Sequence, residues 1–325
     1  MTLSPSRTAD TYDYLGIIDK PKAGVTYKVR NRTTGEFEAL RTLPGASAGD
    51  PETRDRFLRE IRVHTRLAHP NIVAFHDCFE LDGQLVMTAE YVEGHTLAEL
   101  CAAGPLPVSE AIDMVSQVLC GLEEAHALGI VHRAITADHV HITPSGVVKL
   151  GGFGLAKPVA DVKLTQTGAL LGNPRYISPE QVMGAALDAR SDVYSAGILL
   201  FQALAGIVPF DSTNDFDVMV EQVRSVPPAP GAYNSAVSHE LDAVVLHALA
   251  KQPEGRFSTA RAFREALAGC SVTPATPVPS APPPALSAPQ FLTAAPQFNL
   301  PVPMLAFGIA SLTITLTVIL YVTIH

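Results

Sequence analysis

The chain has 325 residues, of which 47% are apolar, and this composition is sufficient for a substantial hydrophobic core. Its net charge of -9, without any cluster of basic residues, argues against nucleic acid as a partner. The four cysteines have neither paired nor metal-ligand spacing, which is typical of free thiols in a reducing compartment. The N-terminal residues lack the apolar core of a secretory signal, so we expect the folded part to be cytoplasmic.

The N-terminal part of the chain predicts a small lobe over residues 12–90. Residues 1–11 are polar and are expected to be flexible. Alternating polar and apolar residues then predict five strands, at 14–18, 24–30, 36–42, 72–78 and 84–90. Between the third and fourth strands, Asp50 followed by Pro51 and Glu52 is typical of the start of a helix. A five-stranded sheet carrying one helix is therefore expected.

Helical patterns dominate the next part of the chain, from residue 95 to residue 269. The clearest helices are predicted at 108–128, 192–205, 240–251 and 259–268. A larger, mainly helical lobe should therefore follow the small lobe after a short hinge. The expected fold class is α+β with two lobes, occupying residues 12–269 together.

Composition changes sharply after the second lobe. Residues 270–303 are dense in Pro, Ala and Ser and predict a disordered, semi-rigid linker. Residues 304–325 contain an uncharged run at 305–324, about the 20 residues that a membrane-spanning helix needs. We expect a single-pass membrane protein with a cytoplasmic N-terminal domain and its C-terminus at the outer face. The small residues Ala306 and Ala310 also make a homodimer through this helix a candidate.

Several short motifs occur in an ordered series along the two lobes. They are His69-Pro70-Asn71-Ile72-Val73, Glu90-Tyr91, Val131-His132-Arg133, Phe153-Gly154, Ser178-Pro179-Glu180, Ser191-Asp192 and Arg256. In order and spacing this series resembles the bacterial Ser/Thr protein kinase family, which has the eukaryotic-like kinase fold. The resemblance implies structural roles for His132, Arg133, Phe153, Glu180, Asp192 and Arg256. Among these roles are a buried pair of Glu180 with Arg256 and backbone hydrogen bonds to Asp192.

The resemblance also locates the groups that phosphoryl transfer requires, namely a base, a lysine and ligands for Mg²⁺. Ala134 stands where the family has its catalytic aspartate, and Thr136 stands at the lysine two residues later. His139 and Gly152 stand at the metal-binding asparagine and aspartate. Because no carboxylate remains at either key position, we expect no metal site. The prediction is a catalytically inactive pseudokinase that is not an enzyme.

The nucleotide pocket implied by the resemblance is altered as well. Arg41 replaces the phosphate-binding lysine and is placed to pair with Glu60, while His141 replaces the apolar floor of the adenine site. Asp19 and Pro21 occupy two positions where glycines normally let the backbone approach phosphates. The pocket positions are Gly24, Ala39, Arg41, Glu60, Ala89, Tyr91 and His141. We expect no cofactor, weak ATP binding at most, and no use of Mg²⁺.

Thr165 and Thr167 resemble the paired threonines that are phosphorylated in the activation loops of bacterial receptor-type kinases. They are candidate phosphorylation sites, and a polar loop without this role is the alternative. The main functional hypothesis is a membrane-tethered scaffold or allosteric partner of active kinases or of phospho-reader proteins. Two alternatives stay open: a membrane-bound Ser/Thr kinase that uses non-standard residues, with Asp138 as a replacement base, and a non-catalytic nucleotide sensor.

Overall fold

The computed structural model describes residues 4–7, 11–19, 24–43, 51–81, 84–155, 157–158 and 173–270. These residues belong to one structural unit, Met1–Ala275. No helix in these ranges is both long and apolar enough to cross a bilayer. The expected linker and membrane-spanning helix lie outside the described residues, apart from Cys270.

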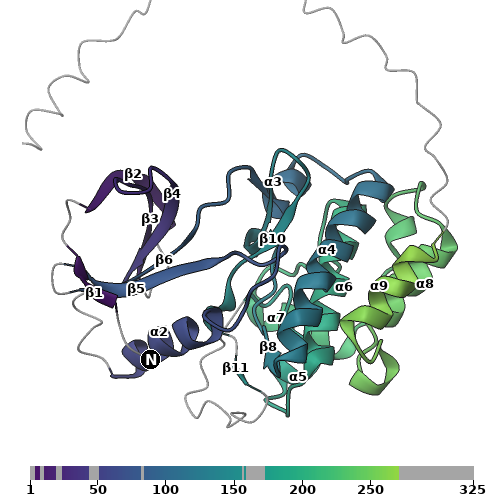
Figure 1. Ribbon diagram of the computed structural model, residues 1–325. Helices are drawn as coiled ribbons and strands as arrows, with labels where there is room; N and C mark the ends of the chain where they lie inside the picture. The colour runs from purple at the N-terminus through teal and green to yellow at the C-terminus, as the bar shows by residue number, and fades with distance from the viewer. Residues whose placement is uncertain are drawn as a thin grey trace, which may run out of the picture. The chain divides into compact units, whose positions relative to one another are not determined.

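The small lobe is built on a six-stranded sheet of order β1-β5-β6-β4-β3-β2 (Figure 1). The strands are β1 (Ser4–Arg7), β2 (Tyr12–Asp19), β3 (Val25–Asn31), β4 (Phe37–Thr42), β5 (Phe75–Leu81) and β6 (Gln84–Glu90). Neighbouring strands are antiparallel except β1, which pairs with β5 in parallel. The expected count of five strands is wrong by one, because residues 4–7 form an edge strand instead of a flexible end. Their sequence has no alternating pattern, so pairing with β5 is what defines this strand.

Helix α2 (Pro51–His64) lies against one face of this sheet (Figure 1). Its buried Phe57 and Ile61 cluster with Cys78 of β5 and Met87 of β6. A second cluster includes Val29, Leu40 and Phe79, together with three other buried side chains of the sheet. The helix is therefore held to the sheet by apolar burial, which fixes the position of the polar residues that it carries toward the second lobe.

Helices form most of the second lobe. They are α3 (Leu97–Ala102), α4 (Val108–Ala127), α5 (Pro179–Val182), α6 (Ala189–Ala205), α7 (Asp215–Arg224), α8 (His239–Ala248) and α9 (Ala260–Ala268). Helix α6 is buried over almost its whole length and contacts α4, α8 and α9. Asp188 caps its first turn, and Gly206 ends it in the left-handed conformation. The four predicted helices are present here within a few residues, and the two-lobed α+β fold is confirmed.

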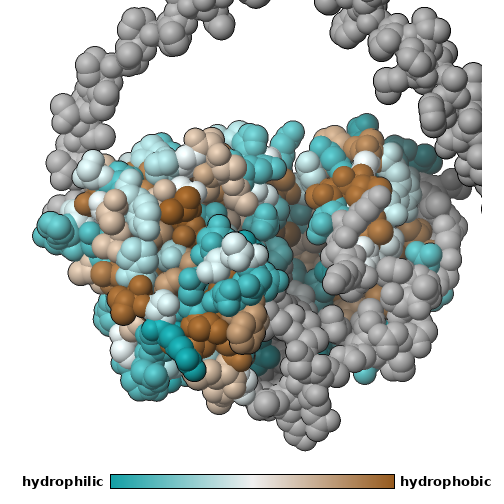
Figure 2. Space-filling view, turned by 180° about the vertical axis from the view of Figure 1, so that it is seen from behind, coloured by the Kyte–Doolittle hydropathy of each residue, from teal (hydrophilic) through white to brown (hydrophobic). Residues whose placement is uncertain are grey.

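Short elements connect the lobes and carry the loops of interest. They are the strands β7 (His95–Thr96), β8 (Ile130–Val131), β9 (Val140–Ile142), β10 (Val148–Leu150) and β11 (Lys157–Pro158), and the 3-10 turns η2 (Ala137–His139) and η3 (Phe153–Leu155). Strands β7, β9 and β10 form one small sheet, and β8 pairs with β11. On the face shown in Figure 2, hydrophobic and hydrophilic side chains are interspersed in small patches. Scattered apolar residues of this kind are normal on a protein surface and identify no partner.

A buried ion pair joins α5 to the segment between α8 and α9. The Arg256 guanidinium donates two hydrogen bonds of 2.7 Å to the two carboxylate oxygens of Glu180. The Arg256 side chain is fully buried and that of Glu180 is 6% exposed. Burial acts to raise the pKa of Glu180, but the bonds from Arg256 and from Ser191 hold it below its ordinary value. Arg256 also donates to backbone carbonyls, so both partners are satisfied.

Replacing Arg256 by methionine should lower the free energy of unfolding by about 3–5 kcal/mol, because it leaves a buried carboxylate without its partner. The matched control is the exposed pair of Arg175 with Asp211, whose side chains are 39% and 59% exposed. Asp211→Asn should cost at most about 1 kcal/mol, since solvent screens this pair. Urea unfolding followed by circular dichroism compares the two variants. Equal losses of stability would contradict the assignment of Glu180–Arg256 as a structural pair.

Candidate active site

A cleft of about 840 Å³ lies between the small lobe and the loops of the second lobe. Strands β4 and β6 and helix α2 supply one wall, and the loops before β9 and after β10 supply the other. Its lining includes most positions of the nucleotide pocket expected from the sequence, and Ala134, Thr136, His139 and Gly152 as well. The structure therefore brings these candidate residues together in one place.

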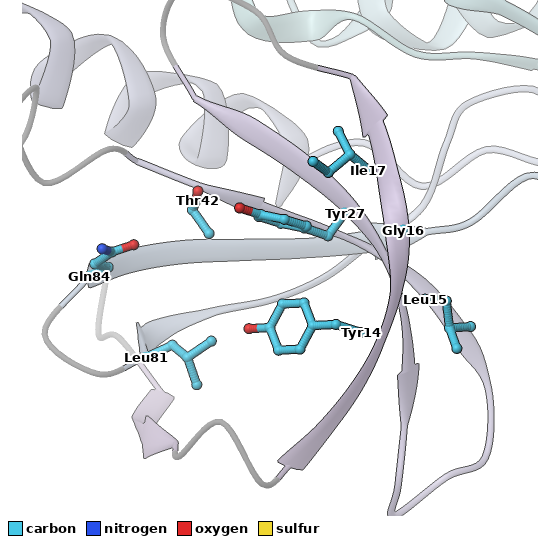
Figure 3. Close-up of a pocket in the computed structure, with 8 residues that line it drawn as sticks. All are labelled: Tyr14, Leu15, Gly16, Ile17, Tyr27, Thr42, Leu81 and Gln84. Atoms are coloured by element: carbon cyan, nitrogen blue, oxygen red, sulfur yellow. The ribbon is translucent and has the colours of Figure 1, made fainter.

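A second pocket, of about 630 Å³, lies on the small lobe itself. Figure 3 shows Tyr14 and Tyr27 side by side on neighbouring strands, with Leu81 and Gln84 at the far end. The two tyrosine rings meet edge to face with centroids 5.5 Å apart. Among the described residues, its lining holds no carboxylate, imidazole, thiol or basic group, so the cleft between the lobes is the better candidate for chemistry.

An ion pair inside the cleft joins the sheet to α2. The Nη1 atom of Arg41 on β4 donates to Glu60 of α2 at 2.6 Å. Burial raises the pKa of Glu60, and the charge of Arg41 opposes this shift. The Nε atom of Arg41 is buried and has no hydrogen-bond partner among the described residues. Gly154 lies against the Glu60 carboxylate, where a Cβ atom would come within 3.0 Å of an oxygen.

A buried carboxylate anchors the first residues of the loop between β8 and η2. Asp192 of α6 accepts hydrogen bonds from the backbone N–H groups of His132, at 2.8 Å, and Arg133, at 2.9 Å. The Nε2 atom of His126 lies 2.8 Å from the same carboxylate. Burial acts to raise the pKa of Asp192, but these bonds and the nearby histidines hold it below its ordinary value. Arg133 has a φ of 68°, and its loop therefore needs this anchor.

A stack of aromatic rings connects this loop to α2. Phe153 lies between His132, with ring centroids 4.3 Å apart, and His64, with centroids 5.4 Å apart. The Nε2–H group of His132 donates to the carbonyl of Gly151, and its Nδ1 atom accepts from the backbone of Ala134. Burial lowers the pKa of both histidines to about 4, so each ring is neutral at physiological pH.

His139 and Gly152 share one space in the cleft. The Nδ1 atom of His139 lies 2.7 Å from the carbonyl oxygen of Ala134. Gly152 has a φ of 79°, and a Cβ atom added there would come within 2.5 Å of the His139 ring. The imidazole therefore occupies the space that a side chain at position 152 would need. An aspartate at position 152 is incompatible with His139 in this orientation.

The remaining pocket positions line the same cleft, except Gly24. Ala39 and Ala89 face each other across β4 and β6, and the ring of Tyr91 lies 4.1 Å from the Nζ atom of Lys28. Burial lowers the pKa of His141 on β9, and the nearby His139 adds to this effect. Thr136 is buried within the loop. A Cβ atom at Gly24 would come within 2.6 Å of the Thr42 carbonyl.

Some features of the site lie beyond what sequence reasoning identified. His64 and His126 were not singled out, because a histidine inside a helix gives no sequence signal for its tertiary partner. The pairing of His139 with Gly152 was also missed, although both positions were named separately. The candidate phosphorylation sites Thr165 and Thr167 lie outside the described residues, as does Pro21.

Comparison with other proteins identifies the family. A model of the protein kinase domain matches residues 12–267. The chain belongs to the protein kinase family. It is 36% identical over 267 residues to the Ser/Thr-protein kinase PknB of Mycobacterium leprae, a match that covers 80% of this chain and 43% of PknB. A probable Ser/Thr-protein kinase of Streptomyces coelicolor, SCO3848, is 36% identical over 273 residues, or 82% of this chain and 41% of that protein.

Solved structures agree with this assignment for the kinase domain. The crystal structure of the PknI kinase domain of Mycobacterium tuberculosis superposes with a TM-score of 0.62 at 30% identity. The match covers 79% of this kinase-family chain and 95% of that domain. The chain spans less than half the length of the curated relatives that it matches.

These relatives correct the functional interpretation drawn from the sequence. The prediction of a catalytically inactive scaffold that is not an enzyme is wrong, because the curated relatives are named Ser/Thr protein kinases. The expectation of no cofactor and no Mg²⁺ is wrong for the same reason, since such kinases normally require ATP and Mg²⁺. The cleft as a whole still holds Arg41, Glu60, Asp138 and His139.

The shared space of His139 and Gly152 predicts a specific coupling. Gly152→Ala should lower the free energy of unfolding by about 1–3 kcal/mol, because it adds a clash to an unfavourable φ. In a His139→Ala background the clash is gone, so the cost should fall by about 0.5–3 kcal/mol. Denaturant unfolding of the four proteins in the cycle measures this difference.

Gly146 is the matched control for this cycle. Its φ of 82° is similar, but a Cβ atom there would meet nothing within 4 Å. Gly146→Ala should therefore cost the same with and without His139. If Gly152→Ala behaves in the same way, the two residues do not compete for space.

Proposed function

We propose that this chain is a Ser/Thr protein kinase that transfers phosphate from ATP through residues other than the family's usual set. The observation that carries the proposal is the cleft, in which the Arg41–Glu60 pair, Asp138 and His139 converge on one space between the lobes. Membership of a family whose curated relatives are named kinases supports it. Protein substrates in signalling are the partners that fit this activity.

Arg41 positions the phosphates of ATP in this proposal. Phosphoryl transfer depends mostly on positioning and on charge compensation at the phosphate oxygens. The hydrogen bond that Arg41 donates to Glu60 fixes the guanidinium at the inner wall of the cleft. Guanidinium groups donate several hydrogen bonds in one plane and bind phosphate well. Arg41 therefore has the chemistry to hold ATP without the usual lysine.

Asp138 is the residue best suited to hold Mg²⁺ in this cleft. No group of three potential protein ligands is present among the described residues. However, Mg²⁺ commonly binds one or two carboxylates together with substrate phosphates, and Asp138 is an exposed carboxylate in the cleft lining. When bound, Mg²⁺ supplies charge compensation to the phosphates. One protein carboxylate makes the phosphates themselves the main source of ligands.

The kinase proposal predicts transfer of radiolabelled phosphate from ATP to a generic protein substrate in the presence of Mg²⁺. Arg41→Ala should reduce the rate by about 10²-fold, because it removes a positioned charge from the transferred group. Arg30→Ala is the control, since Arg30 is exposed on β3 and, within the described part of the chain, its side chain bonds only the nearby Gly35 carbonyl. Incorporation by the unaltered protein that does not exceed that of Arg41→Ala would contradict the proposal.

Regulation by phosphorylation of Thr165 or Thr167 is part of the proposal. Arg133 supports it, because its Nε and Nη2 atoms are buried and have no partner among the described residues. Burial lowers the pKa of Arg133. The carboxylate of Asp192 opposes this shift, and the positive charge of Arg59 adds to it. A phosphothreonine would supply acceptor oxygens and negative charge to such a group.

Attachment to a membrane through residues 305–324 is also proposed, on the strength of their length and lack of charge. Deletion of residues 305–325 should move the protein from the membrane fraction to the soluble fraction. The control deletes 282–301, a stretch of similar length from the linker, and should leave the protein with the membrane. Fractionation and immunoblotting measure both. Retention of the first variant on membranes would contradict the anchor.

A further inference from the structure

A turn at residues 173–176 forms part of the wall that the second lobe contributes to the cleft. Asn173 lines the cleft, and the chain runs from there into α5. Within the turn, the backbone N–H of Tyr176 donates to the Asn173 carbonyl and that of Arg175 donates to the Asn173 side chain, both at 3.1 Å. Because these described residues lie outside the helices and strands, the other carbonyls of the turn depend on donors from elsewhere.

Helix α7 supplies two such donors from one side chain. The Nε2 atom of Gln222 donates to the carbonyl of Pro174 at 3.1 Å and to the carbonyl of Arg175 at 2.9 Å. A glutamine amide carries two N–H hydrogens, so both are used on this turn. Gln222 and Pro174 are buried, and loss of the amide would leave the Pro174 carbonyl without this partner away from solvent.

The orientation of the Gln222 amide is itself fixed. The hydroxyl of Tyr194 on α6 donates to the Oε1 atom of Gln222 at 2.7 Å. The Nζ atom of Lys251 donates to the Tyr194 hydroxyl at 3.2 Å and to the main-chain carbonyl of Gln222 at 2.8 Å. Because the hydroxyl accepts from Lys251, its single hydrogen is directed at Gln222. The amide cannot turn over without breaking its three bonds, so its N–H groups stay directed at the turn.

We propose that Gln222 is a positioning residue for the protein substrate, an inference that rests on the proposed kinase function. In that function Arg41 holds ATP from the small lobe, and the substrate hydroxyl approaches along the opposite wall, which the second lobe supplies. Asn173 and the turn behind it belong to that wall. Gln222 does not line the cleft itself. It fixes the path of the backbone on which the substrate would lie.

A purely structural role is the competing explanation, and the contacts beyond the turn separate the two. The carbonyl of Tyr176 accepts from the hydroxyl of Ser195 on α6 at 2.8 Å. Helix α5 is held by the buried pair of Glu180 with Arg256. The far end of the turn is therefore anchored independently of Gln222. Removing the amide should shift the cleft side of the turn and leave α5 in place.

The kinetic test uses the full-length protein and the variant Gln222→Met, whose side chain has a similar length and no N–H donor. The ratio kcat/KM for a protein substrate should fall by about 10- to 100-fold, because a small displacement of a binding surface is enough to misplace the substrate. The KM for ATP should change by less than about twofold, since the small lobe is unaltered. Hydrolysis of ATP without a protein substrate should keep its rate, because water needs no place on the turn.

Gln117→Met is the matched control. Gln117 is a partly buried glutamine of α4 that donates to a loop carbonyl, that of Gly146, and neither residue lines the cleft. This variant should keep kcat/KM for the protein substrate within about twofold of the unaltered protein. Equal losses in the two variants would overturn the positioning role. An equal rise of KM for ATP and for the protein substrate in Gln222→Met would overturn it as well.

Hydrogen exchange separates failure of this inference from failure of the kinase function. The N–H groups of Arg175 and Tyr176 should exchange about tenfold faster in Gln222→Met, because the turn opens more often, while those of α9 keep their rate. Tyr194→Phe removes only the hydroxyl that orients the amide. It should give a smaller increase at the same two groups, and it carries the test if Gln222→Met does not fold.

The two readouts lead to different conclusions. Unchanged exchange at Arg175 and Tyr176 in the folded variants would overturn the positioning role and leave the kinase function standing where the unaltered protein transfers phosphate. Absence of transfer by the unaltered protein would overturn the kinase function and the substrate role of the turn with it, even where exchange shows that Gln222 holds the turn.

Discussion

The carboxylate of Asp192 is the contact on which the arrangement of the cleft depends. It is buried in α6 and accepts hydrogen bonds from two consecutive backbone N–H groups, those of His132 and Arg133. Without it these two donors would be buried and unsatisfied, and only the bond from Gln181 to the Arg133 carbonyl would hold this backbone at its positive φ among the described contacts. The loop would then lose its path, and with it the carbonyl of Ala134 that orients His139. A residue outside the cleft lining thus helps to set the geometry of the groups that line it.

The same logic explains why the unusual residues of the cleft are mutually consistent. His139 fits only because position 152 is a glycine, and the Glu60 carboxylate lies closely against another glycine, Gly154. The imidazole ring of His139 stands where the family has a smaller asparagine amide. The absence of a side chain at Gly152 makes room for the ring. Changes that compensate in volume keep an interior at its normal density and cost little stability. The cleft is therefore a differently filled site rather than an emptied one.

The fold was largely predictable from local patterns, whereas the contacts within the site were not. Helices α4, α6, α8 and α9 have apolar residues at helical spacing, and tertiary packing agrees with that signal. Strand β1 was missed because its four residues do not alternate and its pairing with β5 is parallel and distant in sequence. The order of the motifs along the sequence identified which residues line the cleft. It carried no information on the bond of His139 to Ala134, because tertiary hydrogen bonds depend on side-chain direction.

The charge distribution of the cleft bears on the proposed binding of ATP together with Mg²⁺. Arg41 is largely neutralised by Glu60, and Lys149 by Glu90, so neither pair offers a full positive charge to ATP. The exposed Asp138 adds a negative charge to the same space. A triphosphate entering this cleft would meet repulsion that one guanidinium cannot offset, because nearby like charges act over several ångströms. In the proposed function, a divalent cation bound together with ATP would reduce that repulsion, and Asp138 would then be a ligand instead of an obstacle. The single carboxylate would therefore link the binding of the cation to the binding of the nucleotide.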